Sequence, residues 1–159
     1  MQFYSHSGIH TLQTETVINR SMKEVWSFFS DPANLVIITP PHMKFKITSP
    51  PPIRNEVYEG MVITYEVSPV KGMRANWVTE ITKVEPQNFF IDEQRFGPYA
   101  MWHHEHHFKQ LPEGVKMIDK VSYKMPLGPL GQVAQTLFVK RQLKQIFSYR
   151  ENVLSTIFT

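Results

Sequence analysis

The sequence predicts an α+β domain: a curved antiparallel sheet of about seven strands around one long C-terminal helix, with two short helices after the first strand. Three observations support this class. Period-two alternation recurs in short runs through the middle of the chain, and residues 130–158 near the C-terminus have helical spacing. No strand–helix–strand alternation typical of a parallel sheet occurs. Without a repeat or linker, residues 1–159 are expected to form a single domain.

The first predicted elements are one strand and two short helices. Alternation over His10–Ile18 predicts the strand. A capping box at Ser21–Glu24 precedes an apolar run with helical spacing, so the first helix should begin there. Asp31 followed by proline combines an N-cap with a residue suited to the first helical position. A second helix is therefore expected over Pro32–Ile38, before the Pro40 pair.

A meander of six strands should follow, because short alternating runs are separated by Pro- and Gly-containing turns. The predicted strands are Phe45–Ile47, Met61–Val67, Asn76–Val84, Phe89–Phe96, Tyr99–Leu111 and Val115–Met125. One helix rarely fills the inner face of such a sheet. The predicted architecture therefore includes a cavity between the sheet and the helix.

The last predicted element is a helix over Leu130–Phe158. Its later turns carry an apolar stripe that should face the sheet: Val139, Leu143, Ile146, Phe147, Val153, Leu154 and Ile157. A second apolar set on nearly the opposite side is expected to pack on the short helices or another subunit: Leu130, Val133, Ala134, Leu137 and Phe138. The cations Lys140, Arg141 and Lys144 should face solvent, whereas Arg150 falls in the middle of the apolar stripe.

Composition excludes several classes of protein. The absence of cysteine excludes disulfides, thiolate nucleophiles and cysteine-ligated zinc. No signal peptide and no apolar run long enough to span a bilayer is visible, so a cytoplasmic location is expected. The net charge is +3, and residues 120–159 contain six basic residues and one acidic residue. No basic cluster of the nucleic-acid-binding kind occurs, so direct recognition of nucleic acid is not expected.

The segment Trp102–Phe108 contains four histidines. Alternation along a strand places His104 and His106 on the same face as Trp102 and Phe108, which should be the buried face. His103 and His107 then lie on the solvent face with Glu105.

Three interpretations of His104 and His106 stay open. They could bind a metal if Asp119, Glu80 or Asp92 supplied a third ligand. They could orient a ligand in an apolar pocket, or they could be core histidines paired with carboxylates. No third metal ligand is placed by the sequence, so no metal and no cofactor is predicted.

Arg150 should be buried against the sheet, where a guanidinium needs an anionic partner. Asp119 or Glu80 could form this ion pair; alternatively, Arg150 holds an anionic group of a ligand or extends to the rim. No nucleophile elbow, phosphate-binding loop, dinucleotide-binding motif or zinc-protease motif occurs, so catalytic residues remain unknown and enzyme status is uncertain.

Several segments together resemble the Bet v 1/START-like SRPBCC superfamily, and within it the bacterial branch labelled cyclase/dehydrase-like or cell-division inhibitor. These segments are Ser30–Leu35, Ile38–Pro41, Trp77–Ile81, Asp92–Tyr99, Trp102–Phe108, Asp119–Tyr123, Pro126–Gly131 and Phe147–Arg150. The resemblance covers nearly the whole chain and implies a helix-grip (Bet v 1-like) fold with a hydrophobic cavity. Members of the superfamily include lipid and hormone carriers, polyketide cyclases and a ribosome-associating toxin, so the fold alone does not fix the function.

The function predicted from these observations is the binding or carriage of a small hydrophobic ligand, lipid-like or aromatic, in an internal cavity. The expected ligand-binding residues are Trp77, Trp102, His104, His106, Phe108, Asp119, Tyr123, Phe147, Arg150 and Leu154. One alternative is a polyketide cyclase/dehydrase-like enzyme that uses the cavity histidines as acid and base. Another is a protein- or ribosome-interaction module, or a homodimer, formed through the basic C-terminal helix.

Overall fold

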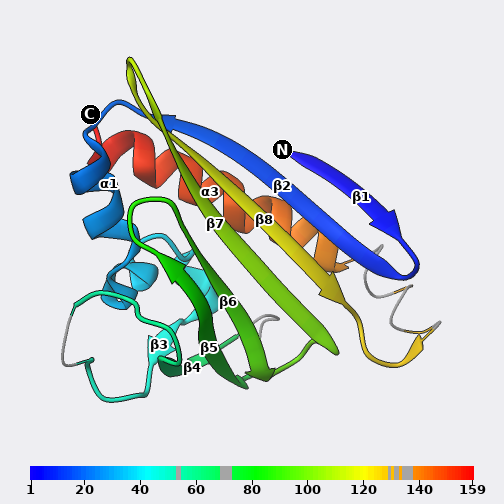
Figure 1. The fold of residues 1–159 in the computed structure, drawn as a ribbon. Helices are drawn as coiled ribbons and strands as arrows, with labels where there is room; N and C mark the ends of the chain where they lie inside the picture. The colour runs from blue at the N-terminus through cyan, green and yellow to red at the C-terminus, as the bar shows by residue number, and fades with distance from the viewer. Residues whose placement is uncertain (53–54, 69–72, 129, 131–132, 134–137) are drawn as a thin grey trace.

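An eight-stranded antiparallel sheet forms the body of the molecule (Figure 1). The computed structural model describes residues 1–159 except 53–54, 69–72, 129, 131–132 and 134–137. In spatial order the strands are β1-β2-β8-β7-β6-β5-β4-β3, so β3 to β8 form a meander and β2 pairs with β8. Their bounds are β1 Gln2–His6, β2 Ile9–Ile18, β3 Lys46–Ile47, β4 Val62–Val67, β5 Ala75–Glu85, β6 Phe89–Phe96, β7 Met101–Leu111 and β8 Gly114–Lys124.

The predicted strands agree closely with the observed ones, and Phe89–Phe96 has the predicted bounds. The sheet has one strand more than expected because β1 pairs with β2 as an N-terminal hairpin. Four of the five residues of β1 are exposed, so its sequence lacks the apolar alternation by which the other strands were predicted.

The short helices begin after the predicted N-cap residues, Ser21 and Asp31. Helix α1 (Met22–Phe29) has the complete capping box, in which the Ser21 hydroxyl accepts from the Glu24 amide and the Glu24 carboxylate accepts from the Ser21 amide. The second helix, η1 (Pro32–Val36), is a 3₁₀ helix shorter than the predicted Pro32–Ile38. The Asp31 carboxylate accepts from the Ala33 amide at 2.9 Å at its start. A further 3₁₀ turn, η2 (Pro41–Met43), follows.

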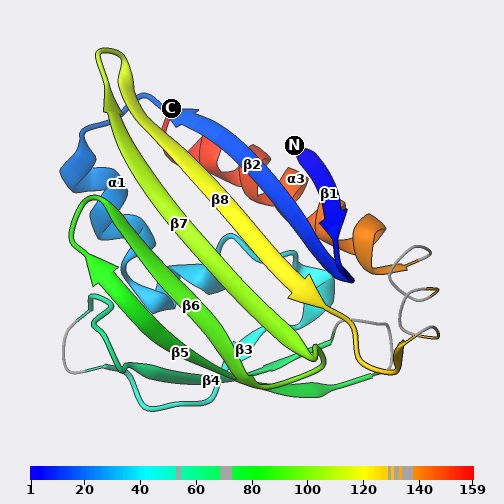
Figure 2. The same ribbon diagram turned by 45° about the vertical axis from the view of Figure 1, so that its right-hand side comes forward.

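Helix α3 (Lys140–Ile157) lies along one face of the sheet (Figures 1 and 2). Its buried residues Leu143, Phe147, Arg150 and Leu154 recur every three or four positions and face the sheet. Ile157, predicted in this stripe, is 41% exposed at the helix end. The predicted solvent-facing cations are exposed: Lys140, Arg141 and Lys144.

The segment before α3 was predicted to continue the helix from Leu130, and part of it, including Ala134 and Leu137, lies outside the described residues. The described Leu130, Val133 and Phe138 are exposed, so the predicted packing of these residues on the short helices is wrong. No helix in the described part of the chain is both long and apolar enough to cross a bilayer.

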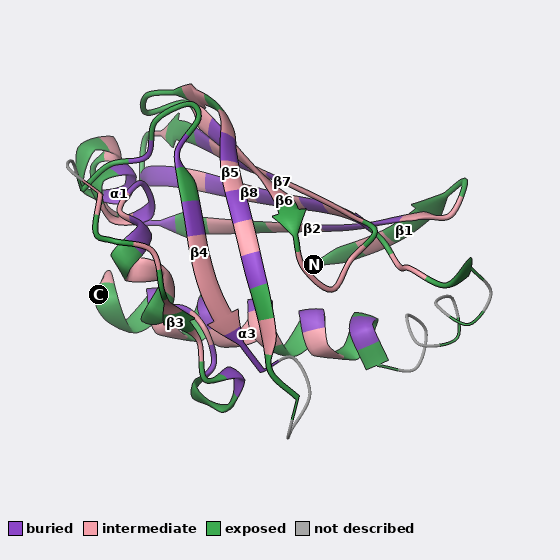
Figure 3. Cartoon of the chain, turned by 90° about the horizontal axis from the view of Figure 1, so that it is seen from below, coloured by how far each residue is buried: buried purple, intermediate pink, exposed green. Residues whose placement is uncertain are grey.

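Irregular pairing between β5 and β6 bends the sheet around α3. The register shifts between Val78 and Thr79 and again between Ile81 and Lys83, and such bulges increase strand bending and twist. Along β5 buried and less buried positions alternate (Figure 3), so Trp77, Thr79 and Ile81 point to the inner face. The inner face therefore presents aromatic, polar and aliphatic side chains to the helix.

The turn between β7 and β8 depends on Gly114, whose φ is +146°. A Cβ on Gly114 would lie 2.2 Å from the carbonyl oxygen of Ile18 on β2. We expect Gly114→Ala to lower the free energy of unfolding by at least about 2 kcal/mol, because strain in φ adds to a backbone clash. Gly60→Ala, at φ +83° with nothing within 4 Å of the added Cβ, should cost about 1 kcal/mol. Urea unfolding of both variants measures this difference, and equal losses would contradict it.

Candidate functional site

A cavity of about 180 Å³ lies among α3, the short helices and the inner face of β4 to β7. Most of its lining is apolar, and nine described lining residues carry large aromatic rings: Phe28, Phe29, Phe45, Tyr65, Trp77, Phe90, Tyr99, Trp102 and Phe147. Aliphatic side chains complete these walls, among them Leu35, Ile38, Ile63 and Ile81. Its ionisable side chains are Asp31, Asp92, His104, His106 and Arg150. The cavity is thus mostly apolar, with ionisable groups on part of its wall.

Contacts between aromatic rings form one side of the cavity. The rings of Trp77 and Trp102 are perpendicular with centroids 5.2 Å apart, and Tyr99 lies 4.9 Å from Trp102. The Tyr65 hydroxyl shares a 2.9 Å hydrogen bond with Thr79, and burial raises the pKa of Tyr65. Among the described residues, the buried Nε1–H of Trp77 has no hydrogen-bond acceptor. Leaving this buried donor without an acceptor costs free energy.

The charged side of the cavity is built by strand register. Asp92 on β6 is paired with His104 on β7, and His106 on β7 is paired with Asp119 on β8. Alternation turns all four side chains to the inner face, as predicted for the histidines. Arg150 of α3 reaches the same place from the helix. Three neighbouring strands and the helix thus bring five ionisable groups together.

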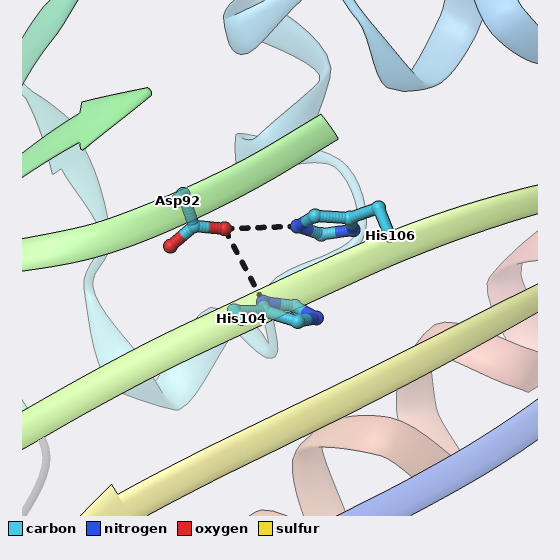
Figure 4. Close-up of side chains that lie close together, drawn as sticks. All are labelled: Asp92, His104 and His106. Carbon is cyan, nitrogen blue, oxygen red and sulfur yellow. Dashed lines mark hydrogen bonds and ion pairs between the residues drawn. The ribbon is translucent and has the colours of Figure 1, made fainter. Parts of the chain in front are cut away.

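Each of the two histidines lies between two carboxylates. Asp92 Oδ2 lies 2.9 Å from His106 Nε2 and 3.4 Å from His104 Nδ1 (Figure 4). On the other side, Asp119 Oδ1 is hydrogen-bonded to His104 Nε2 at 2.8 Å. The same oxygen lies 3.0 Å from His106 Nδ1, but this pair is not aligned as a hydrogen bond. The imidazole centroids are 3.7 Å apart. We call Asp92, His104, His106, Asp119 and Arg150 the charged cluster.

Arg150 forms the predicted internal ion pair, although through one contact only. Its Nη1 lies 3.3 Å from Asp119 Oδ1, and its guanidinium packs over Phe147 at 4.8 Å. Its buried Nε–H has no acceptor among the described residues. Arg150 therefore retains hydrogen-bonding capacity inside the protein.

The charges of the cluster shift one another's pKa values. Burial opposes ionisation of Asp119, but Arg150 and the two histidines outweigh it and hold the pKa of Asp119 well below its usual range. The histidines, outweighing burial in the same way, lower the pKa of Asp92. Burial and the neighbouring His106 lower the pKa of His104, whereas the two adjacent aspartates outweigh burial and raise the pKa of His106. The cluster thus favours the ionised form of both aspartates, and the protonated form of His106 over that of His104.

Asp92, His104 and His106 are a group that could hold a metal ion, because one ligand atom from each lies within 4.8 Å of the others. Glu80, also considered as a partner, lies elsewhere. It pairs with Arg95 at 2.6 Å on the other face of the sheet, because it alternates with the inward-facing Thr79 and Ile81.

Solved structures match the chain over nearly its whole length, although no protein-family model and no curated protein matches it. The Zhui aromatase/cyclase from Streptomyces sp. R1128 has a TM-score of 0.71 at 14% identity, covering 92% of this chain and 91% of that one. Protein Ms6760 from Mycobacterium smegmatis has a TM-score of 0.68 at 14% sequence identity, and the match covers 99% of this chain and 98% of that one. Ara h 8.0201 has a TM-score of 0.64 at 14% identity, and the match covers 94% of this chain and 99% of that one.

The chain has the Bet v 1-like helix-grip fold. In this Bet v 1-like structure, the cavity lies between the sheet and α3, where the sequence predicted it. Of the ten predicted ligand-binding residues, six line the cavity: Trp77, Trp102, His104, His106, Phe147 and Arg150.

The other four predicted residues do not line the large cavity. Phe108 and Tyr123 are buried in packed core clusters, because α1 covers Phe108 and the start of α3 covers Tyr123. Asp119 and Leu154 line a second, smaller cavity of about 40 Å³ that also touches Phe147 and Arg150. Sequence reasoning missed several wall residues, among them Tyr65, Thr79 and Ile81. The alternation that selected Trp77 would have found the last two.

The outer histidines lie on the opposite face of β7, as predicted. His103 Nδ1 lies 2.8 Å from a Glu93 carboxylate oxygen, and His107 Nε2 lies 2.9 Å from Glu105. Both side chains are about one-third or more exposed. They take no part in the cavity.

Removing one charge of the buried pair should destabilise the protein strongly. We expect Arg150→Met to lower the free energy of unfolding by about 3–5 kcal/mol, because Asp119 would lose a buried cationic partner. Arg141→Met, on the exposed side of the same helix, should change it by less than about 0.5 kcal/mol. Urea unfolding at neutral pH compares the two. Similar values would show that the ion pair contributes little.

Proposed function

We propose that this protein binds and carries a compact aromatic ligand enclosed between the sheet and α3. The aromatic cavity of about 180 Å³ is the observation that carries the proposal. An apolar cavity of about 150 Å³ is sufficient to hold benzene, so the space suits one substituted ring or a small fused system. Removal of apolar ligand surface from water, at about 25 cal/mol per Å², supplies the driving force.

Unused donors indicate that the ligand carries oxygen. Trp77 and Arg150 both line the cavity, and each has a buried N–H without an acceptor among the described residues. An unsatisfied buried donor costs free energy that a ligand acceptor would recover. A carbonyl, phenol or carboxylate on an aromatic ring combines this chemistry with the apolar walls.

The fold similarity to an aromatase/cyclase supports an aromatic, polyketide-like ligand over a long-chain lipid. Binding is the step that a carrier and a cyclase-like enzyme share. A binding experiment therefore tests the proposal without assuming a reaction.

Filling the cavity should abolish binding of a small aromatic probe. We expect one molecule of 2-naphthol per chain by isothermal titration calorimetry and native mass spectrometry. Ile63→Trp, which enlarges a cavity-lining side chain, should weaken this binding at least about tenfold because the ring occupies the ligand's space. Val62→Trp is the matched control, since Val62 adjoins Ile63 on β4 but is 53% exposed. Absence of 2-naphthol binding by the folded protein, or equal binding by both variants, would contradict the proposal.

Removing the Trp77 donor should reduce selectivity for oxygenated probes. The wild-type protein is expected to prefer 2-naphthol over naphthalene, because only 2-naphthol offers a hydrogen-bond acceptor. Trp77→Phe should weaken 2-naphthol binding by about three- to tenfold, in keeping with the loss of one neutral hydrogen bond, with little change for naphthalene. Competition titrations measure the ratio. Parallel losses for both probes would assign Trp77 a purely apolar role.

A further inference from the structure

Three residues of the charged cluster, Asp92, His104 and His106, have the spacing of a metal-binding triad. Asp92 Oδ2 lies 3.4 Å from His104 Nδ1 and 2.9 Å from His106 Nε2, and all three atoms lie within 4.8 Å of one another. Ligand atoms at about 2.1 Å from one tetrahedral ion are about 3.4 Å apart. The two measured distances from Asp92 are thus close to those of a filled site.

A carboxylate next to the outer ring nitrogens of the two histidines is a second feature expected of a metal site. A metal-bound histidine usually directs its other ring nitrogen to a carboxylate, which fixes the ring and its tautomer. Here the remaining nitrogens, His104 Nε2 and His106 Nδ1, both lie against Asp119 Oδ1, at 2.8 and 3.0 Å. Arg150 in turn contacts Asp119 at 3.3 Å. Asp119 therefore supports His104 by a hydrogen bond and lies beside His106 without one, on the side away from Asp92.

The three residues of the triad line the large cavity, whereas Asp119 does not. Asp92, His104 and His106 line the large cavity, and Asp119 lines the small one behind them. Three protein ligands with an open side are typical of reactive rather than structural metal sites. Two imidazoles with one carboxylate, and no thiolate, suit Zn²⁺ or Fe²⁺ better than Ca²⁺ or Mg²⁺.

We propose that Asp92, His104 and His106 bind one divalent transition-metal ion of the Zn²⁺ or Fe²⁺ class at the cavity wall, with Asp119 hydrogen-bonded to the outer nitrogen of His104. Such an ion would present its open positions to an oxygen atom of a molecule in the cavity. Metal binding requires no organic ligand, so this inference can hold or fail independently of the proposed function.

Metal titration of the protein tests the site directly. After treatment with a chelator, the protein should take up one equivalent of Zn²⁺ or Co²⁺, measured by calorimetry and by inductively coupled plasma mass spectrometry. Asp92→Asn and His106→Gln should weaken binding at least about 100-fold, and Asp119→Asn about 10- to 100-fold. His103→Gln and His107→Gln are matched controls on the opposite face of β7 and should bind as the wild type does.

A measurement on the wild-type protein keeps the test decisive if a cluster variant does not fold. Addition of Zn²⁺ should shift the imidazole ¹⁵N resonances of His104 and His106 and leave those of His103 and His107 unchanged. No uptake of either ion, shifts confined to the outer histidines, or equal losses in the control variants would overturn the proposal. Full affinity in a folded Asp119→Asn variant would overturn the supporting role of Asp119.

Discussion

The buried contact between Asp119 on β8 and Arg150 on α3 is the constraint on which the rest of this structure depends. Neither charge can be left alone in an apolar interior, because desolvation of an unpaired ion is very costly. Pairing them requires one particular side of α3 to face the sheet. The same rotation puts Leu143 and Phe147 against the inner surface and leaves Lys144 in water. A polar contact thereby orients an otherwise apolar interface.

The cavity follows from the way the sheet bends around that helix. Bulges between β5 and β6 bend the sheet, and aromatic side chains line much of the space between it and α3. Ring pairs such as Trp77 with Trp102 pack against each other in this wall. The result is an apolar pocket with ionisable groups on part of its wall, the usual design of small-molecule sites.

Local rules predicted much of the fold and part of the site. The inward position of His104 and His106 follows from strand alternation alone, which needs no knowledge of neighbouring strands. Asp92 could not be chosen over other carboxylates, because its place beside the histidines depends on pairing across β6 and β7. Phe108 shares the inward face but lies under α1, and alternation does not reveal which part of that face a helix covers. The exposed first strand has no periodic signal at all.

Phe147 and Arg150 form a partition that is shared by the two cavities. The smaller chamber also touches Thr14 and Thr16 of β2 and Met1 at the N-terminus. Because Phe147 and Arg150 line both spaces, a substitution at either residue changes the shape and polarity of both cavities at once.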